Sequence, residues 1–253
     1  MLAAFEFPPI DEIFRWKDIV FEDTPFAINK TALLILISSA LILILFVGGS
    51  RRMRLVPGRL QNVLELTHEF VDKGITRDVI GADATRFTPF LGSLFLFILF
   101  LNLWSIVPFI QFPPTSRFAI PLFLALQTYV IYWYLGFRHH GVSYLTGHLF
   151  PPGVPWPLYA LVTPIEFVQI VFVRPFSLAV RLLANMMAGH ILITALALLT
   201  AYSLENAIPG FFLGPFAMTV AVVGFELLVG FLQAYIFTLL TAVYIADSLH
   251  PEH

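Results

Sequence analysis

Long apolar stretches alternate with short polar segments along most of the chain. Each long stretch is close to or above the about 20 residues that a helix needs to cross about 30 Å of hydrocarbon. The pattern predicts an all-α membrane protein with about five transmembrane helices, folded as a single membrane domain over residues 1–253. The five stretches cover residues 31–49, 87–110, 118–137, 158–202 and 211–247.

The last two stretches are too long to cross the membrane once at a right angle. Residues 158–202 would make a helix of about 67 Å, roughly twice the membrane thickness. Pro175 lies inside this stretch, but a proline only kinks a helix. We expect two overlong, strongly tilted helices joined by a hairpin near residues 205–214. Two crossings within residues 158–202 are the alternative.

A different pattern occupies residues 60–80, between the first two apolar stretches. Here apolar residues recur at helical spacing, at Leu60, Val63, Leu64, Phe70 and Val71. This spacing predicts an amphipathic helix that lies on the membrane surface. A solvated cytoplasmic helix is the alternative.

Basic residues indicate how the chain is oriented. Residues 51–86 contain seven lysines and arginines, whereas the next loop contains only Arg117. Because cytoplasmic loops carry the excess of basic residues, we expect residues 51–86 in the cytoplasm and the N-terminal segment 1–30 outside.

The loop after the third stretch is then also cytoplasmic, and it contains three histidines, His139, His140 and His148. They lack the helical spacing of metal ligands, and no carboxylate lies near them in the sequence. We therefore interpret this loop as a stiff, proline-rich connector and expect no metal site.

Composition supports the membrane class and excludes several others. Of the 253 residues, 58% are hydrophobic and 12% are charged, whereas about a quarter are charged in a soluble domain. A net charge of -2 and a pI near 6.4 exclude a generally basic nucleic-acid binder. The absence of cysteine excludes disulfides and thiol chemistry. No GxxxxGK[ST] phosphate loop occurs, and residues 1–30 resemble neither a signal peptide nor a transit peptide.

One charge stands inside an apolar stretch. Arg181 lies about 22 residues from either end of residues 158–202, too far to reach the interface unless the helix lies nearly flat. An arginine at the bilayer centre costs about 2.5–3.5 kcal/mol on insertion scales. We expect it to face a partner charge or a water path. An ion pair that fixes helix packing is the alternative.

Other polar residues share the helix face of Arg181. At 100° per residue, Arg174, Ser177 and Asn185 lie within about 40° of it. In the last stretch Glu226 and Gln233 share a face, with Tyr244 near the same line. This arrangement predicts a polar stripe along two neighbouring helices.

His190 falls on the opposite face of its helix from Arg181. A histidine and a glutamate inside apolar helices are a plausible proton relay, because burial and pairing move their pKa values toward working pH. His190 and Glu226 are the candidates. A structural contact in which they neutralise each other is the alternative.

These residues lie in motifs that resemble a known family. SLAVRLLANMMAGHIL, followed by ELLVGFLQAYIFTLLTAVYIADSLH, resembles the signature of subunit a of the F-type ATP synthase. The likeness extends through RRMRLVPGRLQ, LNLWSIVP and PPGVP, so it covers the chain from about Thr31. The VRLLANMMAGH form is most similar to the bacterial branch related to mitochondria.

The resemblance implies a static, non-catalytic subunit that conducts protons beside a rotating c-ring and so couples the proton gradient to ATP synthesis. Its partners would be the c-ring, subunit b of the peripheral stalk, membrane lipid and the translocated proton, with no nucleic acid and no cofactor. The expected location is the bacterial plasma (inner) membrane, with the mitochondrial inner membrane as alternative. The sequence leaves proton and sodium undistinguished.

The family also implies roles for individual residues. Arg181 matches the arginine that faces the c-ring carboxylate and separates two aqueous half-channels. Asn185 and Gln233 match polar positions beside it, and Asn102 matches a position along the outer half-channel. His190 and Glu226 match a coupled pair, which we expect to pass protons toward the c-ring.

Two positions depart from the family pattern. Glu166 lies eight residues before Arg174, where the family often has a glutamate seven before, so Glu166 is the weakest candidate for lining the cytoplasmic half-channel. Arg117 stands where many members have Asp or His. Two other classes of protein are kept as alternatives: a secondary ion-coupled carrier, which would need internal repeats, and a non-conducting assembly subunit, which would not need the polar stripe.

Overall fold

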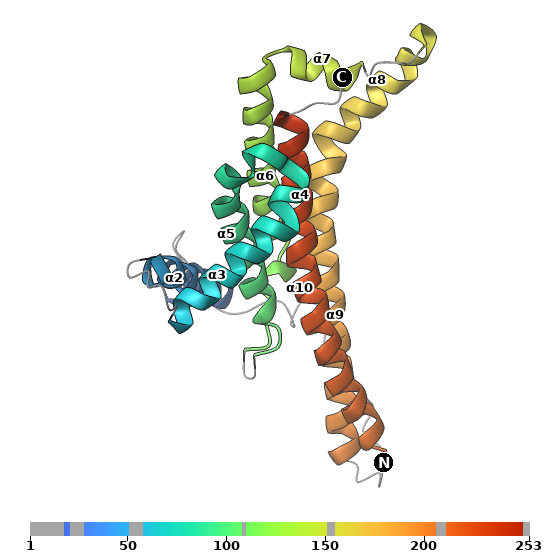
Figure 1. Cartoon of the computed structure of the whole chain (residues 1–253). Helices are drawn as coiled ribbons and strands as arrows, with labels where there is room; N and C mark the ends of the chain where they lie inside the picture. The colour runs from blue at the N-terminus through green and yellow to red at the C-terminus, as the bar shows by residue number, and fades with distance from the viewer. Residues whose placement is uncertain are drawn as a thin grey trace. The chain divides into compact units, whose positions relative to one another are not determined.

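A computed structural model describes most of the chain (Figure 1). Among the described residues, five helices are long and apolar enough to cross a membrane. The predicted all-α membrane fold is therefore confirmed. The described residues are 18–20, 28–50, 58–107, 110–150, 155–205 and 211–249, and the five helices are Lys30–Ser50, Ala84–Leu103, Ala119–His140, Trp156–Leu204 and Leu213–Leu249.

The first long helix is α2 (Lys30–Ser50), and a short antiparallel ladder of β1 (Asp18–Val20) and β2 (Ile28–Asn29) precedes it. The Asn29 side chain accepts a hydrogen bond from the Ala32 N–H at 2.9 Å. An asparagine in this position caps a helix start, so the sequence itself sets where α2 begins. The rest of the predicted N-terminal segment 1–30 lies outside the described residues.

The predicted helix over residues 60–80 is present as one helical run. It consists of α3 (Arg59–Val71), the π-helical η1 (Asp72–Thr76) and α4 (Arg77–Ile80). The buried Asp72 carboxylate accepts a bond from the Thr88 hydroxyl at 2.9 Å and pairs with the Arg77 Nε at 2.7 Å. Its position on the membrane surface stays a prediction.

The second long helix, α5 (Ala84–Leu103), follows the short η2 (Gly81–Asp83) and ends earlier than predicted. After Leu103 the chain turns: the Ser105 N–H bonds the Asn102 carbonyl at 3.2 Å, and the Ser105 hydroxyl bonds the same oxygen at 2.8 Å. Pro108 follows in the sequence and disfavours helix in the residue before it. Hydropathy alone extended the prediction to residue 110, because the residues of this turn are also apolar.

The third long helix is α6 (Ala119–His140), which the 3₁₀ turn η3 (Pro114–Ser116) precedes and the short α7 (Ser143–Leu149) follows. Gly141, between α6 and α7, has φ +58°, which only glycine adopts readily. Gly136 is equally constrained, because a Cβ there would lie 2.6 Å from the Tyr144 ring. The two glycines let α7 fold back onto α6.

The fourth stretch is one continuous helical run of 49 residues. It contains η4 (Trp156–Leu158), α8 (Tyr159–Val168), the π-helical η5 (Gln169–Val173) and α9 (Arg174–Glu205). The π segment ends just before Pro175, which cannot donate to the Val171 carbonyl and would clash with it in a regular helix. A π segment is a known response to such a break.

The last helix, α10 (Leu213–Leu249), is 37 residues long. Both overlong helices were predicted, whereas the centre of the predicted hairpin, residues 206–210, lies outside the described residues. The helices divide between two compact units. Unit 1 comprises Met1–Ile44, Leu96–Arg117 and Leu183–Ala234, and unit 2 comprises Leu45–Phe95, Phe118–Leu182 and Tyr235–His253.

Candidate functional site

Asn102, near the end of α5, is hydrogen-bonded through both its side-chain nitrogen and its side-chain oxygen inside unit 1. Its side-chain N–H₂ donates to the Gly230 carbonyl of α10 at 3.0 Å, and its oxygen accepts from the Thr115 hydroxyl at 2.9 Å. Gly230 allows this approach, because a Cβ there would lie 3.3 Å from the Asn102 Cβ. Asn102 therefore joins α5 to α10 in a fixed geometry.

Two further amides meet between α9 and α10 in unit 1. The Asn185 side-chain nitrogen donates to the Gln233 Oε1 at 2.7 Å. Gln233 is buried, and its Nε2 finds no acceptor among the described residues. The predicted polar stripe on two neighbouring helices is thus present for this pair.

The two predicted relay residues both lie in unit 1. Glu226 of α10 and His190 of α9 are both buried, and the Glu226 carboxylate lies against Gly189, where a Cβ would be 3.1 Å from the Glu226 Oε1. We call Glu226, Gly189 and His190 the glutamate cluster. Because Gly189 has no side chain, the Glu226 carboxylate can approach α9 at the position directly before His190.

The Glu226 carboxylate is incompletely satisfied. Neither oxygen has a hydrogen bond of good geometry within the described part of the chain, although the Ser105 hydroxyl interacts with this carboxyl group. A buried carboxylate without bonds is costly, unless water or a proton satisfies it. The environment of Glu226 is therefore one in which its carboxyl group can exchange a proton with water.

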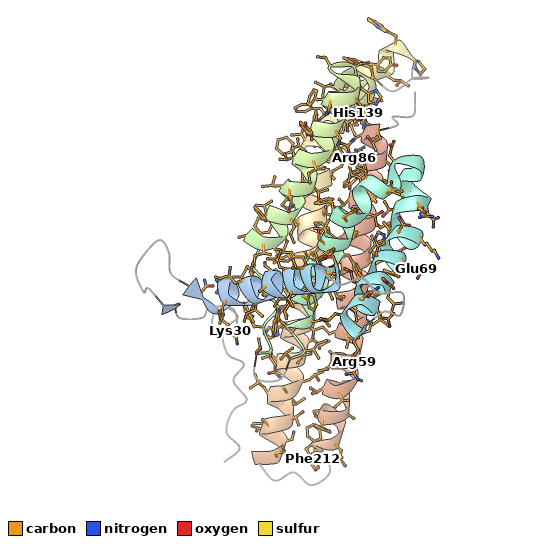
Figure 2. The ribbon with its side chains drawn as sticks, turned by 60° about the vertical axis from the view of Figure 1, so that its left-hand side comes forward. Lys30, Arg59, Glu69, Arg86, His139 and Phe212 are labelled. Atoms are coloured by element: carbon orange, nitrogen blue, oxygen red, sulfur yellow. The ribbon has the colours of Figure 1, made fainter. Side chains whose placement is uncertain are left out.

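Lys30 adds a charge that sequence reasoning missed. Its Nζ donates to the Ile110 carbonyl at 2.7 Å and lies 5.9 Å from the centre of the Phe112 ring. Its ammonium also interacts electrostatically with His190. Figure 2 labels Lys30 at the start of α2. In the sequence Lys30 stands at the edge of an apolar stretch, and this position did not indicate its contacts with Ile110, Phe112 and His190.

Arg181 lies in the part of α9 that belongs to unit 2 and is half-buried. Among the described residues, no carboxylate lies within 4.0 Å of its guanidinium, and its electrostatic partner there is Tyr244. The alternative of an ion pair that fixes packing therefore has no support within the described ranges. The arginine can meet a negative charge from outside this chain.

A second polar group in unit 2, the Asp247 cluster, consists of Arg174, Asp247 and His148. One carboxylate oxygen of Asp247 lies 3.0 Å from the Arg174 Nη1 and 3.1 Å from the His148 Nε2. The Arg174 guanidinium also lies 5.5 Å from the centre of the Tyr244 ring. A pocket of about 670 Å³ is lined by Arg174, Tyr244 and Asp247 together with Gln169 and Val79.

The sequence did not link the members of the Asp247 cluster. His148 was interpreted as part of a connector, and its partner lies 99 residues away. The bond to Asp247 raises the pKa of His148 above its ordinary value, against the opposing effect of burial. His139 and His140 bond backbone carbonyls, of Leu135 and Leu249, and the described residues contain no group of three metal-ligand side chains.

Two predicted site residues lie outside both clusters. Ser177 is exposed and Glu166 is partly exposed. Neither side chain has a hydrogen bond or ion pair to another residue of the described segments. Of the predicted site residues, Asn102, Asn185, His190, Glu226 and Gln233 lie within unit 1, and Arg181 and Tyr244 lie within unit 2. Within unit 1 a direct hydrogen bond joins Asn185 to Gln233.

Ionisable groups inside apolar helices are typical of membrane proteins that move ions across the bilayer. Residues 32–246 match the family model described as "ATP synthase A chain". The chain therefore belongs to the ATP synthase subunit a family, and it is a membrane-sector protein of proton transport and ATP synthesis.

Individual relatives support the assignment over nearly the full length. The ATP synthase subunit a of Rhodococcus erythropolis is 39% identical over 260 residues, which cover 99% of this chain and 94% of the relative. That of Frankia alni is 39% identical over 253 residues, covering 97% and 87%. That of Rhodopseudomonas palustris is 39% identical over 246 residues, covering 96% of each. These bacterial relatives agree with a multi-pass bacterial membrane protein.

Proposed function

We propose that this chain is the static subunit that conducts protons to and from a ring of c subunits and thereby couples proton flow to ring rotation and ATP synthesis. The observation that carries the proposal is Arg181, a half-buried guanidinium with no carboxylate within 4.0 Å in the described residues. A fixed charge of this kind needs a counter-charge, and a mobile ring carboxylate supplies one.

Arginine suits this task because it stays protonated even in an apolar site. It attracts an unprotonated ring carboxylate and lowers that group's proton affinity. A carboxylate that passes Arg181 must therefore give up its proton on one side and accept another beyond it. The same charge repels protons that would leak directly between the two sides.

The outer half-channel would use unit 1. Glu226 and His190 of the glutamate cluster pass protons in this half-channel. Asn102 holds α5 against α10, and the Asn185–Gln233 pair adds further polar groups between α9 and α10. The incomplete hydrogen bonding of Glu226 supports its role as a proton carrier, since such a group gains from water or a proton.

The cytoplasmic half-channel would use the pocket of unit 2. Asp247 and Tyr244 line it, and the positive-inside pattern puts the neighbouring α6–α7 turn in the cytoplasm. The chain carries no phosphate-binding loop, so ATP chemistry belongs to other subunits. Its partners are the c-ring, a subunit b stalk and lipid, in a bacterial plasma membrane, and proton is the ion that we propose.

The test is ATP-driven acidification of inverted membrane vesicles that carry the assembled complex. Arg181→Ala is expected to reduce acidification to background, because it removes the charge between the half-channels. Arg138→Ala is the matched control: Arg138 lies on exposed α6 surface against Tyr134, and pumping should be unchanged. An immunoblot must show both variants assembled with the ring. Pumping that survives in assembled Arg181→Ala would overturn the proposal.

A further inference from the structure

The His148 ring lies between two hydrogen-bond acceptors. Its Nδ1 is 3.0 Å from the Tyr144 carbonyl oxygen, and its Nε2 is 3.1 Å from the Asp247 carboxylate. A neutral imidazole carries one N–H, whereas the imidazolium carries two. With Asp247 ionised, as its contact with the Arg174 guanidinium favours, both contacts are hydrogen bonds together only when His148 is protonated.

Asp247 is held by two cations at one atom. The Arg174 Nη1 donates to the same Oδ2 at 3.0 Å, and the Asp247 side chain keeps 32% of its surface exposed at the pocket. His148 is more enclosed, with 12% of its side chain exposed. His148 thus contacts Asp247 from the more buried side, whereas the Asp247 carboxylate lines the pocket.

Further contacts fasten the end of α6 and the start of α7 to the last turn of α10. The Tyr144 hydroxyl lies 3.2 Å from the Ser248 hydroxyl, and the His140 Nε2 lies 3.1 Å from the Leu249 carbonyl. The Tyr144 ring is buried against Gly136. These contacts hold the backbone that carries His148 beside the end of α10, which carries Asp247.

The charged and titratable groups around His148 come from every helix packed there. Asp247 comes from α10, Arg174 from α9 and Tyr144 from α7 itself. From α6 come His140 and Tyr129, of which Tyr129 interacts with Tyr144. On the α8 side the Thr163 hydroxyl bonds the Leu149 carbonyl at 3.1 Å and brings no charge.

We propose that protonated His148 is a positioning residue that holds Asp247 at the cytoplasmic pocket and makes proton transfer there depend on cytoplasmic pH. The proposal rests on the proposed function of this pocket as a half-channel. When His148 loses a proton, one of its two ring nitrogens becomes an acceptor facing an acceptor, so the bond to the Tyr144 carbonyl or the bond to Asp247 is lost. In either tautomer the imidazolium charge beside Asp247 is gone, and Arg174 is the cation that remains at the carboxylate. The carboxylate then leaves its fixed position.

The direction of the pH effect follows from the folded-state pKa. The bond to Asp247 raises the pKa of His148 above the usual value of about 6.5. The contact between the imidazolium of His148 and Asp247 is therefore fully present below about pH 6.5, and it is lost as the pH rises through the raised pKa. An alkaline cytoplasm releases Asp247.

Inverted vesicles test this directly, because their cytoplasmic face meets the buffer. The measurement is the initial acidification rate divided by the ATP hydrolysis rate of the same vesicles, taken between about pH 6 and pH 9. In the wild type this ratio should fall several-fold on the alkaline side. His148→Gln keeps a donor at a similar distance and does not titrate, so it should remove that fall, whereas His148→Ala should lower the ratio at every pH.

His139→Gln is the matched control. His139, labelled at the end of α6 in Figure 2, bonds the Leu135 carbonyl of its own helix at 2.9 Å. This variant should keep the wild-type pH profile. If His148→Gln also keeps that profile, the proposal is overturned.

A second readout does not depend on transport. In complexes with ring nitrogen-15 histidine, the His148 signal is the one missing from His148→Gln, and its imidazolium shifts should persist to a higher pH than those of an ordinary histidine. A ring that becomes neutral at or below the ordinary histidine pKa overturns the proposal even if pumping responds. Pumping by Arg181→Ala would instead overturn the proposed function. The Arg181→Ala substitution should not change the His148 signal, so the two failures can be told apart.

Discussion

Polar residues inside the apolar helices differ in how completely they are hydrogen-bonded. The Asn102 side chain has two partners, at 3.0 and 2.9 Å, whereas neither Glu226 oxygen has a well-formed bond among the described residues. A fully bonded amide fixes geometry, and a carboxylate with open acceptors can take a proton or water. Asn102 thus fixes geometry within unit 1, whereas Glu226 has the open acceptors that the proposed proton carrier requires.

Gly189→Ala tests whether the close approach of Glu226 to α9 matters. The added Cβ would lie 3.1 Å from the Glu226 Oε1 and 3.2 Å from its Cδ, so the carboxylate must move. Such overpacking costs about 1–3 kcal/mol, and we expect ATP-driven acidification to fall several-fold. Gly224→Ala on α10 is the control, since nothing lies within 4 Å of its Cβ position. Equal pumping by both variants would contradict the role of the cluster.

At the scale of elements, the π-helical segment η5 changes how Glu166 should be interpreted. A π segment takes up one residue more than an α-helix over the same turn. Since Gln169–Val173 lies between Glu166 and Arg174, eight residues there span what seven span in a regular helix. A π segment at this place can offset the one-residue departure of Glu166 from the family pattern. The sequence could not have indicated this, because Pro175 predicts a kink without specifying its form.

Glu166→Gln follows from this compensation. If the carboxylate reaches the position that the family places at the cytoplasmic half-channel, removing its charge should lower the acidification rate several-fold. Glu69→Gln makes the same change on the exposed face of α3, where Glu69 pairs with Lys73, and should leave the rate unchanged. A wild-type rate in assembled Glu166→Gln would remove Glu166 from the proton path.

At the scale of the whole molecule, hydropathy predicted the long helices but not the contacts between them. Each apolar stretch is a local feature of length and composition, so it is visible without a structure. The Asn102–Gly230 and His148–Asp247 bonds join residues 128 and 99 positions apart. No local pattern marks such partners, so the sequence did not single out Asp247 and His148. It did single out Arg181 and Glu226, because each is an ionisable residue inside an apolar stretch.

Single-cysteine labelling tests how often the chain crosses between α7 and α10. The chain has no cysteine, so Val142→Cys and Phe211→Cys each supply the sole thiol of the subunit, at sites that are 73% and 53% exposed. One crossing by the run Trp156–Leu204 puts them on opposite sides of the membrane. A membrane-impermeant maleimide should then label Val142→Cys in inverted vesicles and Phe211→Cys in right-side-out vesicles.

Two crossings by the same run would put both thiols on one side, and both variants would react in the same vesicles. Labelling of Val142→Cys only in right-side-out vesicles would reverse the orientation that the basic residues 51–86 predict. That result would also move the Asp247 cluster to the outer face, because α7 begins at Ser143, directly after Val142. The pH that controls His148 would then be the external one. This labelling therefore decides which compartment's pH the contact between His148 and Asp247 would follow.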